Sequence, residues 1–185
     1  MRRFSTLVSL VMVGLLGRPV NAAQSNAPPL HVGDVFPQFS GQTFTGKSVT
    51  LPATTVDKPA VLVFSFSRKA AKDARLCNKH LSKDFPNAIS VYGVIEMESA
   101  PKLFCGMAVS GIKSSMPISV QNRTIALYRN EKLWKGRLMV TNNSRAYVLP
   151  LGPAGHIRWM NSGAFTAAEY ARFKRDVSGL LQSPP

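Results

Sequence analysis

Acidic residues are scarce in this chain: nine Asp and Glu stand against 23 Lys and Arg, which gives a formal net charge of +14. An excess this large predicts attraction to anionic lipid headgroups, to nucleic acid or to an acidic partner. The sequence has no RNA- or DNA-binding motif and no interleaving of aromatic and basic residues of the kind that stacking surfaces use. We therefore expect no nucleic-acid partner.

Cysteine is also rare, since the chain has only Cys77 and Cys105, and these do not form a Cys-x-x-Cys pair. They are compatible with one disulfide in an oxidising compartment, and equally with two buried thiols that act as small hydrophobic residues. The sequence has no Walker loop, HExxH motif or nucleophile elbow, and its three histidines are far apart. We expect no metal and no cofactor.

Long hydrophobic runs are missing near the start of the chain, apart from one stretch at residues 7–16 that follows two arginines. This stretch is too short for a transmembrane helix, which needs roughly 20 apolar residues. Small residues up to Ala22 fit a signal-peptidase site, so residues 1–22 are predicted to be the leader of an exported, periplasmic protein. Because no acidic residue precedes Asp34, a mitochondrial presequence is the alternative, and an uncleaved leader would tether the protein to a membrane.

After a polar, Pro-rich linker at residues 23–31, the chain has the composition of one globular domain, predicted at 32–182. Residues 32–52 contain Gly-Asp-x-Phe-Pro-x-Phe and Gly-Lys-x-Val-x-Leu, which resemble the entry of peroxiredoxins and predict an N-terminal β-hairpin. Two apolar runs, 60–67 and 89–97, are typical of strands buried on both faces. A helix between them implies parallel pairing of these strands.

The segment between the two runs, residues 68–84, is predicted to be one helix capped by Ser67. Its apolar face has residues at intervals of four, three and four: Ala70, Ala74, Cys77 and Leu81. Its other face has five cations, which we call the basic stripe: Arg68, Lys72, Arg75, Lys79 and Lys83. A solvated helix face and a docking surface for anionic lipid or an acidic partner both fit this stripe.

A β-hairpin, which we call the final hairpin, is predicted at 146–163 because two apolar runs flank the turn Gly-Pro-Ala-Gly. Pro150 inside the first run predicts an irregular or edge strand. A last helix at 166–181 follows, opened by a capping box between Thr166 and Glu169.

Between the second buried run and the final hairpin, the sequence predicts a helix at 100–114, a strand around 125–128 and a short helix from residue 132. The whole order of elements predicts an α/β fold of the thioredoxin-like class. Such a fold has a central mixed sheet flanked by helices, here with an N-terminal β-hairpin extension.

Thiol chemistry in this fold class needs cysteine directly after the first central strand, where a helix N-terminus lowers the pKa of the thiol. Residues 68–74 have no cysteine, and Cys77 lies about two turns into the helix, where the helix dipole has little effect. The proline expected before the final hairpin is also missing near Arg145 and Ala146. We predict that the protein is not an enzyme. The alternative is an exported peroxiredoxin-like or thiol-disulfide protein that uses Cys77 and Cys105.

In and after the final hairpin, Tyr147-Val148-Leu149, Ile157-Arg158-Trp159 and Ser162-Gly163-Ala164 stand at a distinctive spacing before Glu169. This pattern resembles the C-terminal signature of the mitochondrial F-type ATP synthase assembly factors written out as "ATP ten". The resemblance implies a non-enzymatic chaperone that binds subunit a of the Fo sector and helps it join the ring of c subunits at the mitochondrial inner membrane. The chain departs from the family at Pro150-Leu151, where Val-Asp is common.

On this resemblance, the candidate client-binding residues are Ile157, Arg158, Trp159, Ser162 and Gly163, because Trp and Arg most often anchor interfaces. The structural alternative is that Trp159 covers a face of the sheet and that Arg158 pairs with Glu169 or a helix end. The basic stripe would hold the protein near an anionic membrane surface. A third hypothesis is an exported domain that binds an acidic ligand through charge alone.

Overall fold

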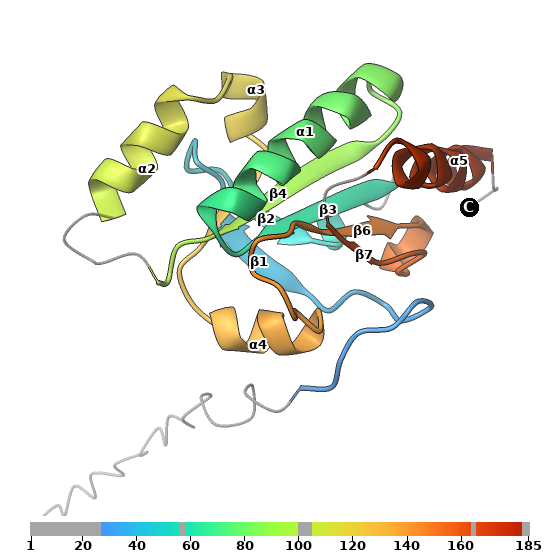
Figure 1. The fold of residues 1–185 in the computed structure, drawn as a ribbon, viewed down its shortest axis with the longest axis horizontal. Coiled ribbons are helices and arrows are strands. Elements are labelled where there is room, and N and C mark those ends of the chain that lie inside the picture. Colours follow the sequence, from blue (N-terminus) through green and yellow to red (C-terminus); the bar gives the residue numbers. More distant parts are fainter. Residues whose placement is uncertain (1–26, 56–57, 100–104, 164–165, 183–185) are drawn as a thin grey trace, which may run out of the picture.

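The computed structural model describes residues 27–55, 58–99, 105–163 and 166–182 (Figure 1). The predicted leader and the first part of the predicted linker lie outside these residues. The helices and strands, in chain order, are β1 (Phe39–Gln42), β2 (Ser48–Leu51), β3 (Ala60–Ser65), α1 (Arg68–Asp84), β4 (Ser90–Glu96), α2 (Cys105–Ser114), α3 (Ile118–Gln121), β5 (Thr124–Leu127), α4 (Glu131–Arg137), β6 (Tyr147–Leu151), β7 (Asn161–Ser162) and α5 (Ala167–Gln182). Short 3-10 turns lie at Ala53–Thr55 and Pro153–Gly155.

A five-stranded sheet with the order β5-β4-β3-β6-β7 forms the centre of the molecule. Strand β3 is parallel to β4, and β4 is parallel to β5, whereas β6 runs antiparallel to both β3 and β7. Every residue of β3 is buried, which confirms the strand that the continuous apolar run predicted. The predicted mixed sheet flanked by helices is confirmed.

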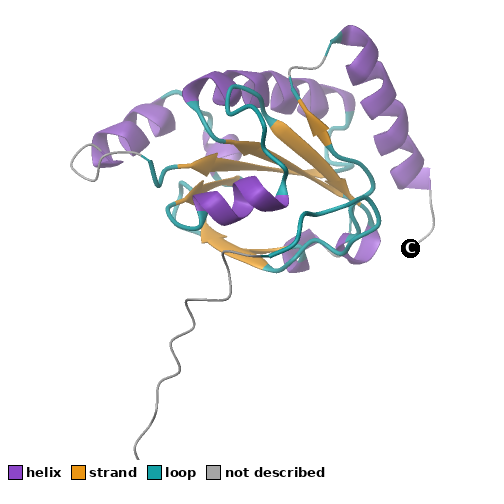
Figure 2. Cartoon of the chain, turned by 60° about the horizontal axis from the view of Figure 1, so that its bottom comes forward, coloured by secondary structure: helices purple, strands orange, loops and turns teal. Residues whose placement is uncertain are grey.

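Helices cover both faces of this sheet (Figure 2). On one face, α1 and α5 bury Cys77, Leu81 and Phe173 against Val63 and Val148 of the sheet. On the other face, helix α4 and the N-terminal segment bury a second cluster that is rich in aromatic rings. Trp134 stacks on Phe36 at 5.5 Å between ring centroids and lies 5.4 Å from Phe64. Helices α1 and α4 therefore lie on opposite sides of the sheet (Figure 1).

The N-terminal hairpin is confirmed, since β1 and β2 pair antiparallel with Phe39 opposite Leu51. The end of the predicted linker at residues 23–31 is corrected by the structure. Leu30 is buried in the core, and its N–H donates to the carbonyl oxygen of Arg137 at 2.8 Å. The packed part of the chain therefore includes residue 30, because an apolar side chain there contacts the face covered by α4.

Strand β6 is not an edge strand, contrary to the prediction from Pro150, because β3 pairs with it on one side and β7 on the other. Pro150 lies opposite Val61 of β3, and its carbonyl oxygen accepts the N–H of Arg158 at 3.0 Å on the outer side. In an antiparallel strand the N and C=O of one residue point to the same side. The nitrogen of Pro150 thus faces away from β3, and no bond between β3 and β6 is lost.

The last helix and its capping box are also confirmed. The N–H of Thr166 donates to Glu169 Oε2 at 2.8 Å, and the N–H of Glu169 donates to Thr166 Oγ1 at 3.2 Å. Phe173 and Val177, four residues apart on one face of α5, are buried, whereas Leu181 in the last turn is 40% exposed.

Candidate functional site

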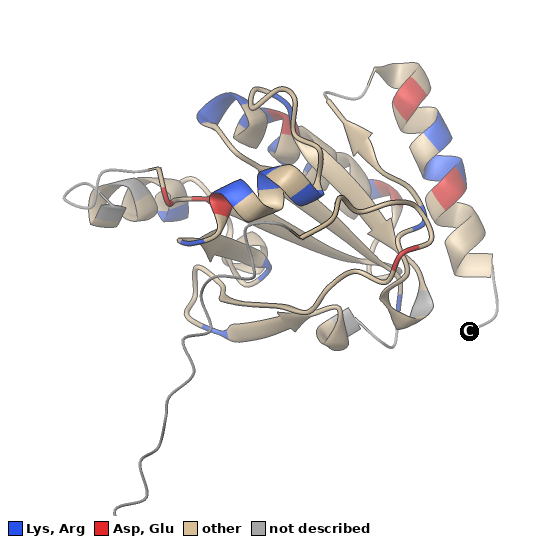
Figure 3. Cartoon of the chain, turned by 90° about the horizontal axis from the view of Figure 1, so that it is seen from below, with Lys and Arg blue, Asp and Glu red and all other residues tan. Residues whose placement is uncertain are grey.

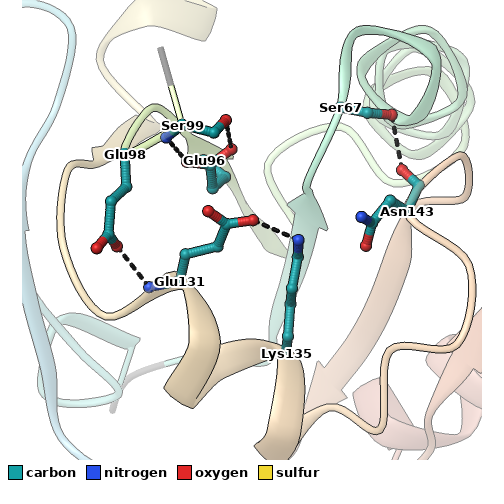
Figure 4. Close-up of polar contacts among 7 residues, drawn as sticks. All are labelled: Ser67, Glu96, Glu98, Ser99, Glu131, Lys135 and Asn143. Carbon is teal, nitrogen blue, oxygen red and sulfur yellow. Dashed lines mark hydrogen bonds and ion pairs between the residues drawn. The ribbon is translucent and has the colours of Figure 1, made fainter. Parts of the chain in front are cut away.

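Helix α1 begins directly after β3, at the place where a thiol enzyme of this fold class would have its cysteine. Ser67 caps the helix, since its Oγ accepts the N–H of Ala70 at 3.1 Å. The same hydroxyl donates to the carbonyl oxygen of Asn143 at 2.6 Å (Figure 4). The helix start is therefore hydrogen-bonded to the loop that precedes β6.

Cys77 is a free thiol inside the core, with only 2% of its surface exposed. Burial raises its pKa to about 12, because the thiolate would lose its solvation. At neutral pH this group is therefore a neutral, apolar side chain on the buried face of α1. The side chain of Cys105, the other candidate thiol, lies outside the described parts of the structure.

The loop before β6 contains no substitute for the missing proline. Neither bond flanking Ala146 is cis, and the cis peptide bond among the described residues joins Leu51 and Pro52. Instead, the hydroxyl of Tyr147 holds the loop, accepting the N–H groups of Thr141 at 3.1 Å and Asn142 at 3.2 Å.

Three of the nine acidic residues of the chain lie at the end of β4 and the start of α4 (Figure 4). Both oxygens of Glu96 accept hydrogen bonds from Ser99, one from its N–H at 2.6 Å and one from its hydroxyl at 2.7 Å. Glu98 Oε2 accepts the N–H of Glu131 at 2.7 Å, at the start of α4, and Glu131 forms an ion pair with Lys135. Glu96 and Glu98 thus have separate hydrogen-bond partners.

The consecutive residues Ile157, Arg158 and Trp159 of the final hairpin have three different environments. Ile157 has 0% of its surface exposed and belongs to the core cluster on the α4 face. Its N–H donates to the carbonyl oxygen of Asp34 at 2.8 Å, and its own carbonyl oxygen accepts the N–H of Gly33 at 2.8 Å. Ile157 joins the N-terminal segment to the hairpin, so it is removed from the predicted client-binding set: a fully buried side chain presents no surface to a client.

Arg158 is exposed, and its side chain lies against Gly152 rather than against Glu169. A Cβ atom added to Gly152 would come within 2.5 Å of Arg158 Nε, so the glycine leaves the space that this arginine occupies. The sequence did not predict this role of Gly152. The Gly-Pro pair indicated only that a turn begins there.

Trp159 is half-buried against α5, with its ring 5.4 Å from that of Phe173. Beside it, a cavity of about 320 Å³ lies between the hairpin and α5, and α5 lines it with two arginines and two carboxylates: Arg172, Arg175, Glu169 and Asp176. The indole therefore both covers the α5 face of the core and forms one wall of a polar crevice. The arginines of this crevice were not predicted, because no sequence spacing connects them to Trp159.

Ser162 and Gly163 end the hairpin beside Arg145. Gly163 has φ +135°, and a Cβ atom there would approach Arg145 Nη1 to 3.0 Å. Arg145 Nη1 also donates to the carbonyl oxygen of Ser162 at 3.4 Å. Gly163 is buried and Ser162 is partly exposed, so the backbone shape explains the glycine without a client.

All five side chains of the basic stripe are exposed along α1. Within the described parts of the chain, no ion pair neutralises them; the two ion pairs join Lys135 to Glu131 and Lys174 to Asp84. Helix α5, in contrast, has basic and acidic residues interspersed (Figure 3). Leu76 lies within the stripe and is 57% exposed.

The described helices include none with the length and apolar character needed to cross a bilayer. Across the same described residues, no group of three or more His, Cys, Asp or Glu side chains is placed to hold a metal ion.

The arrangement of strands and helices is that of the thioredoxin-like proteins. A thiol:disulfide interchange protein DsbE from Chlorobium tepidum aligns with 82% of this chain and 99% of its own, at 15% identity and a TM-score of 0.60. BsSco, from the Sco family of cytochrome c oxidase assembly proteins, aligns over 84% and 97% with 16% identity and a TM-score of 0.56. A peroxiredoxin-like protein from Aquifex aeolicus aligns over 83% and 90% with 13% identity and a TM-score of 0.53. At these identities the likeness establishes the fold.

The family is established by sequence. The family described as ATP10 protein matches residues 33–180, which include the whole sheet and the final hairpin. The chain belongs to this family, as the Ile-Arg-Trp and Ser-Gly pattern indicated. A search of curated proteins finds no match.

Proposed function

We propose that this protein is a non-enzymatic assembly factor of the ATP synthase, and that its client is subunit a of the membrane sector. The observation that supports this proposal is the match of the ATP10 family to residues 33–180. The assembly role is what the resemblance to this family implies. The chain has the family's most distinctive residues in the final hairpin.

The absence of thiol chemistry is the second part of the proposal. The one described thiol is buried with a raised pKa, and the hydroxyl of Ser67 occupies the helix start and is bonded to Asn143. Nucleophilic thiol chemistry needs an accessible thiolate. We therefore propose that the thioredoxin-like fold, which thiol enzymes use for catalysis, acts here as a binding domain.

The proposed client surface is the outer side of the final hairpin, formed by Arg158, Trp159 and Ser162. Trp159 offers a partly exposed indole beside a crevice lined by two arginines and two carboxylates, and the side chain of Arg158 lies over Gly152. Arginine and tryptophan in a preformed arrangement lose little side-chain entropy on binding, which favours their use as anchors.

The basic stripe is the proposed membrane contact. Five exposed cations on one helix face suit an anionic bilayer surface, and the exposed Leu76 among them adds an apolar group that can enter the interface. Two compartments are proposed for this contact. The leader predicts an exported, periplasmic protein, whereas the family resemblance predicts the mitochondrial inner membrane.

Site-specific photocrosslinking tests the client. A photoreactive phenylalanine analogue replaces Arg158 in one variant and Lys132 of α4, an exposed residue outside the final hairpin, in the control. We expect the position 158 variant to capture an ATP synthase membrane subunit and the position 132 variant to capture none. Recovery of no ATP synthase subunit from position 158, or equal capture from both positions, would overturn the proposed client surface.

Vesicle flotation tests the membrane contact separately. Lys72→Glu with Lys79→Glu changes the stripe by four charges, and the control Arg129→Glu with Lys132→Glu makes the same change near α4. We expect only the first pair to abolish binding to vesicles with anionic lipid, and added salt to weaken wild-type binding. Equal loss in both pairs would show that net charge alone, and not the stripe, attracts the protein.

The enzymatic alternative is tested by insulin reduction and peroxide consumption. Turnover by the wild type that disappears in Cys77→Ser would refute the non-enzymatic part of the proposal. We expect both proteins to be equally inactive.

A further inference from the structure

Strand β4 extends beyond its neighbour β5. Pairing with β5 begins at Gly93 opposite Thr124, so Ser90, Val91 and Tyr92 have a strand partner only on the β3 side. The N–H of Ser90 points to the β3 side, where it donates to the carbonyl oxygen of Pro59. The N–H of Gly93 points to the β5 side, where it donates to the backbone carbonyl oxygen of Arg123. Since backbone groups alternate along a strand, Val91 presents its N–H and C=O to the side that β5 does not cover.

A cavity of about 270 Å³ lies at this uncovered edge, between α1, β4 and the chain around α3. Phe85, Ile89 and Val120 give it an apolar lining, and Asn78 and Ser82 of α1 add polar groups. Arg123, which is exposed, is the one charged side chain of the lining, and no carboxylate is part of it. We call this cavity and the adjacent edge of Ser90–Tyr92 the β4 groove.

Asn78 gives the groove an unused polar atom. Its Oδ1 is buried and has no hydrogen-bond partner among the described residues. The nearby hydroxyl of Thr124 is already engaged, since it donates to the carbonyl oxygen of Val120 at 2.8 Å. A buried acceptor without a partner is costly, and a ligand that brings an N–H or O–H group would remove that cost.

Glycine at position 93 keeps the groove open. A Cβ atom added there would lie 3.4 Å from Thr124 Oγ1 and 3.9 Å from Asn78 Nδ2, which are ordinary contact distances. The backbone therefore does not require glycine at this position. A side chain here would instead enter the space between Asn78 and the strand edge.

We propose that the β4 groove binds an extended acidic segment of a partner protein, which adds a short strand to the edge of β4. The segment would exchange backbone hydrogen bonds with Val91, place an apolar side chain against Phe85 and Ile89, donate a hydrogen bond to Asn78 and pair a carboxylate with Arg123. Backbone bonds to an uncovered edge with side-chain pockets beside it are the chemistry of β-strand addition. Electrostatics favours an acidic partner over a second copy of this chain, because each copy has a net charge of +14.

The groove is distinct from the proposed client surface, because β4 and β7 are separated in the sheet by β3 and β6. The inference goes beyond the proposed function and does not depend on it. The groove proposal and the client-surface proposal can therefore fail independently. Loss of crosslinking at position 158 would not affect peptide binding in the β4 groove, and loss of peptide binding would not affect the client surface.

Selection from phage-displayed random peptides of about eight residues, on the immobilised full chain, tests the proposal. We expect enrichment of sequences with an acidic residue flanked by β-branched or aromatic residues. Binding should slow hydrogen exchange of the Val91 amide. Arg123→Glu should weaken the selected peptides about tenfold or more, as expected for loss of a charge-assisted hydrogen bond.

Gly93→Leu should likewise abolish binding by filling the groove, while Lys132→Glu, a charge reversal on the opposite side of the sheet, should change affinity little. Because Arg123 is exposed, its variant keeps the test valid even where Gly93→Leu folds poorly. No enrichment, enrichment of basic peptides, unchanged affinity in both groove variants, or protection away from β4 would each overturn the proposal. So would a peptide-independent dimer, measured by light scattering, that disappears in Gly93→Leu.

Discussion

The environments of Ile157 and Arg158 predict that neighbouring substitutions in one motif will have separate effects. Ile157→Ala removes a side chain that is fully buried in the core on the α4 face. Large-to-small changes of this kind cost about 2–5 kcal/mol, because lost burial is added to the cavity that remains. Ile157→Val removes one methylene group and should cost only about 1 kcal/mol.

We expect the Ile157→Ala cost to lie near the middle of this range, at about 3 kcal/mol, because the backbone of Ile157 stays bonded to Gly33 and Asp34 and limits collapse of the site. For a chain of this length such a loss lowers the melting temperature by about 6–12 °C. Arg158→Ala should change stability by less than about 1 kcal/mol, since the side chain is exposed and lies over Gly152.

Urea unfolding followed by circular dichroism measures these free energies, and co-purification of an ATP synthase membrane subunit measures client binding by the same variants. We expect Ile157→Val to keep client binding and Arg158→Ala to weaken it at nearly wild-type stability, whereas the covalent photocrosslink at position 158 can still trap a weakened complex. The reasoning would be refuted by a loss below about 1 kcal/mol for Ile157→Ala, or by equal destabilisation from Arg158→Ala.

Three further predictions follow from the described contacts. Cys77 should not react with a thiol reagent at neutral pH until the protein unfolds, because burial raises its pKa to about 12; mass spectrometry of native and urea-treated protein measures the labelling. The pKa of Asp84 is lowered from 3.8 by its hydrogen bond from Tyr170 and its ion pair with Lys174. The ionised Asp84 therefore stabilises the folded state above pH 3.8, and this contribution is lost as the pH falls below 3.8. The difference in unfolding midpoint between wild type and Asp84→Asn should narrow below pH 3.8. Gly163→Ala should cost about 1–3 kcal/mol in urea unfolding, because φ +135° is strained for any residue with a Cβ atom, and an unchanged midpoint would contradict it.

Helix α1 shows how much of the fold could be predicted from the sequence. Its bounds agree with the prediction at both ends, because the cap at Ser67 and the regular burial of small and apolar residues are local signals. The buried strands β3 and β4 were predictable for the same reason, from continuous apolar runs bounded by polar residues. Local patterns are sufficient where one element's own residues decide its structure.

The errors occurred where distant residues decide. Considered within its own strand, Pro150 indicates an edge strand. It is compatible with an inner strand because its nitrogen faces away from β3, on the side where its carbonyl oxygen accepts the N–H of Arg158. Leu30 belonged to a polar stretch, and only its contact with α4 shows that it is packed. In the candidate site, the family resemblance located the hairpin, but burial separated Ile157 from its exposed neighbour.

The entry of the chain beside α4 restricts how this domain can be oriented at a bilayer. Leu30 is fixed to Arg137 on the α4 face, whereas the basic stripe lies on α1 across the sheet (Figure 1). If the leader were kept as an anchor, the seven residues 23–29 would span at most about 25 Å when fully extended. A short tether on one face would thus oppose flat docking through the other, so stripe-mediated contact is best compatible with a domain released from its leader.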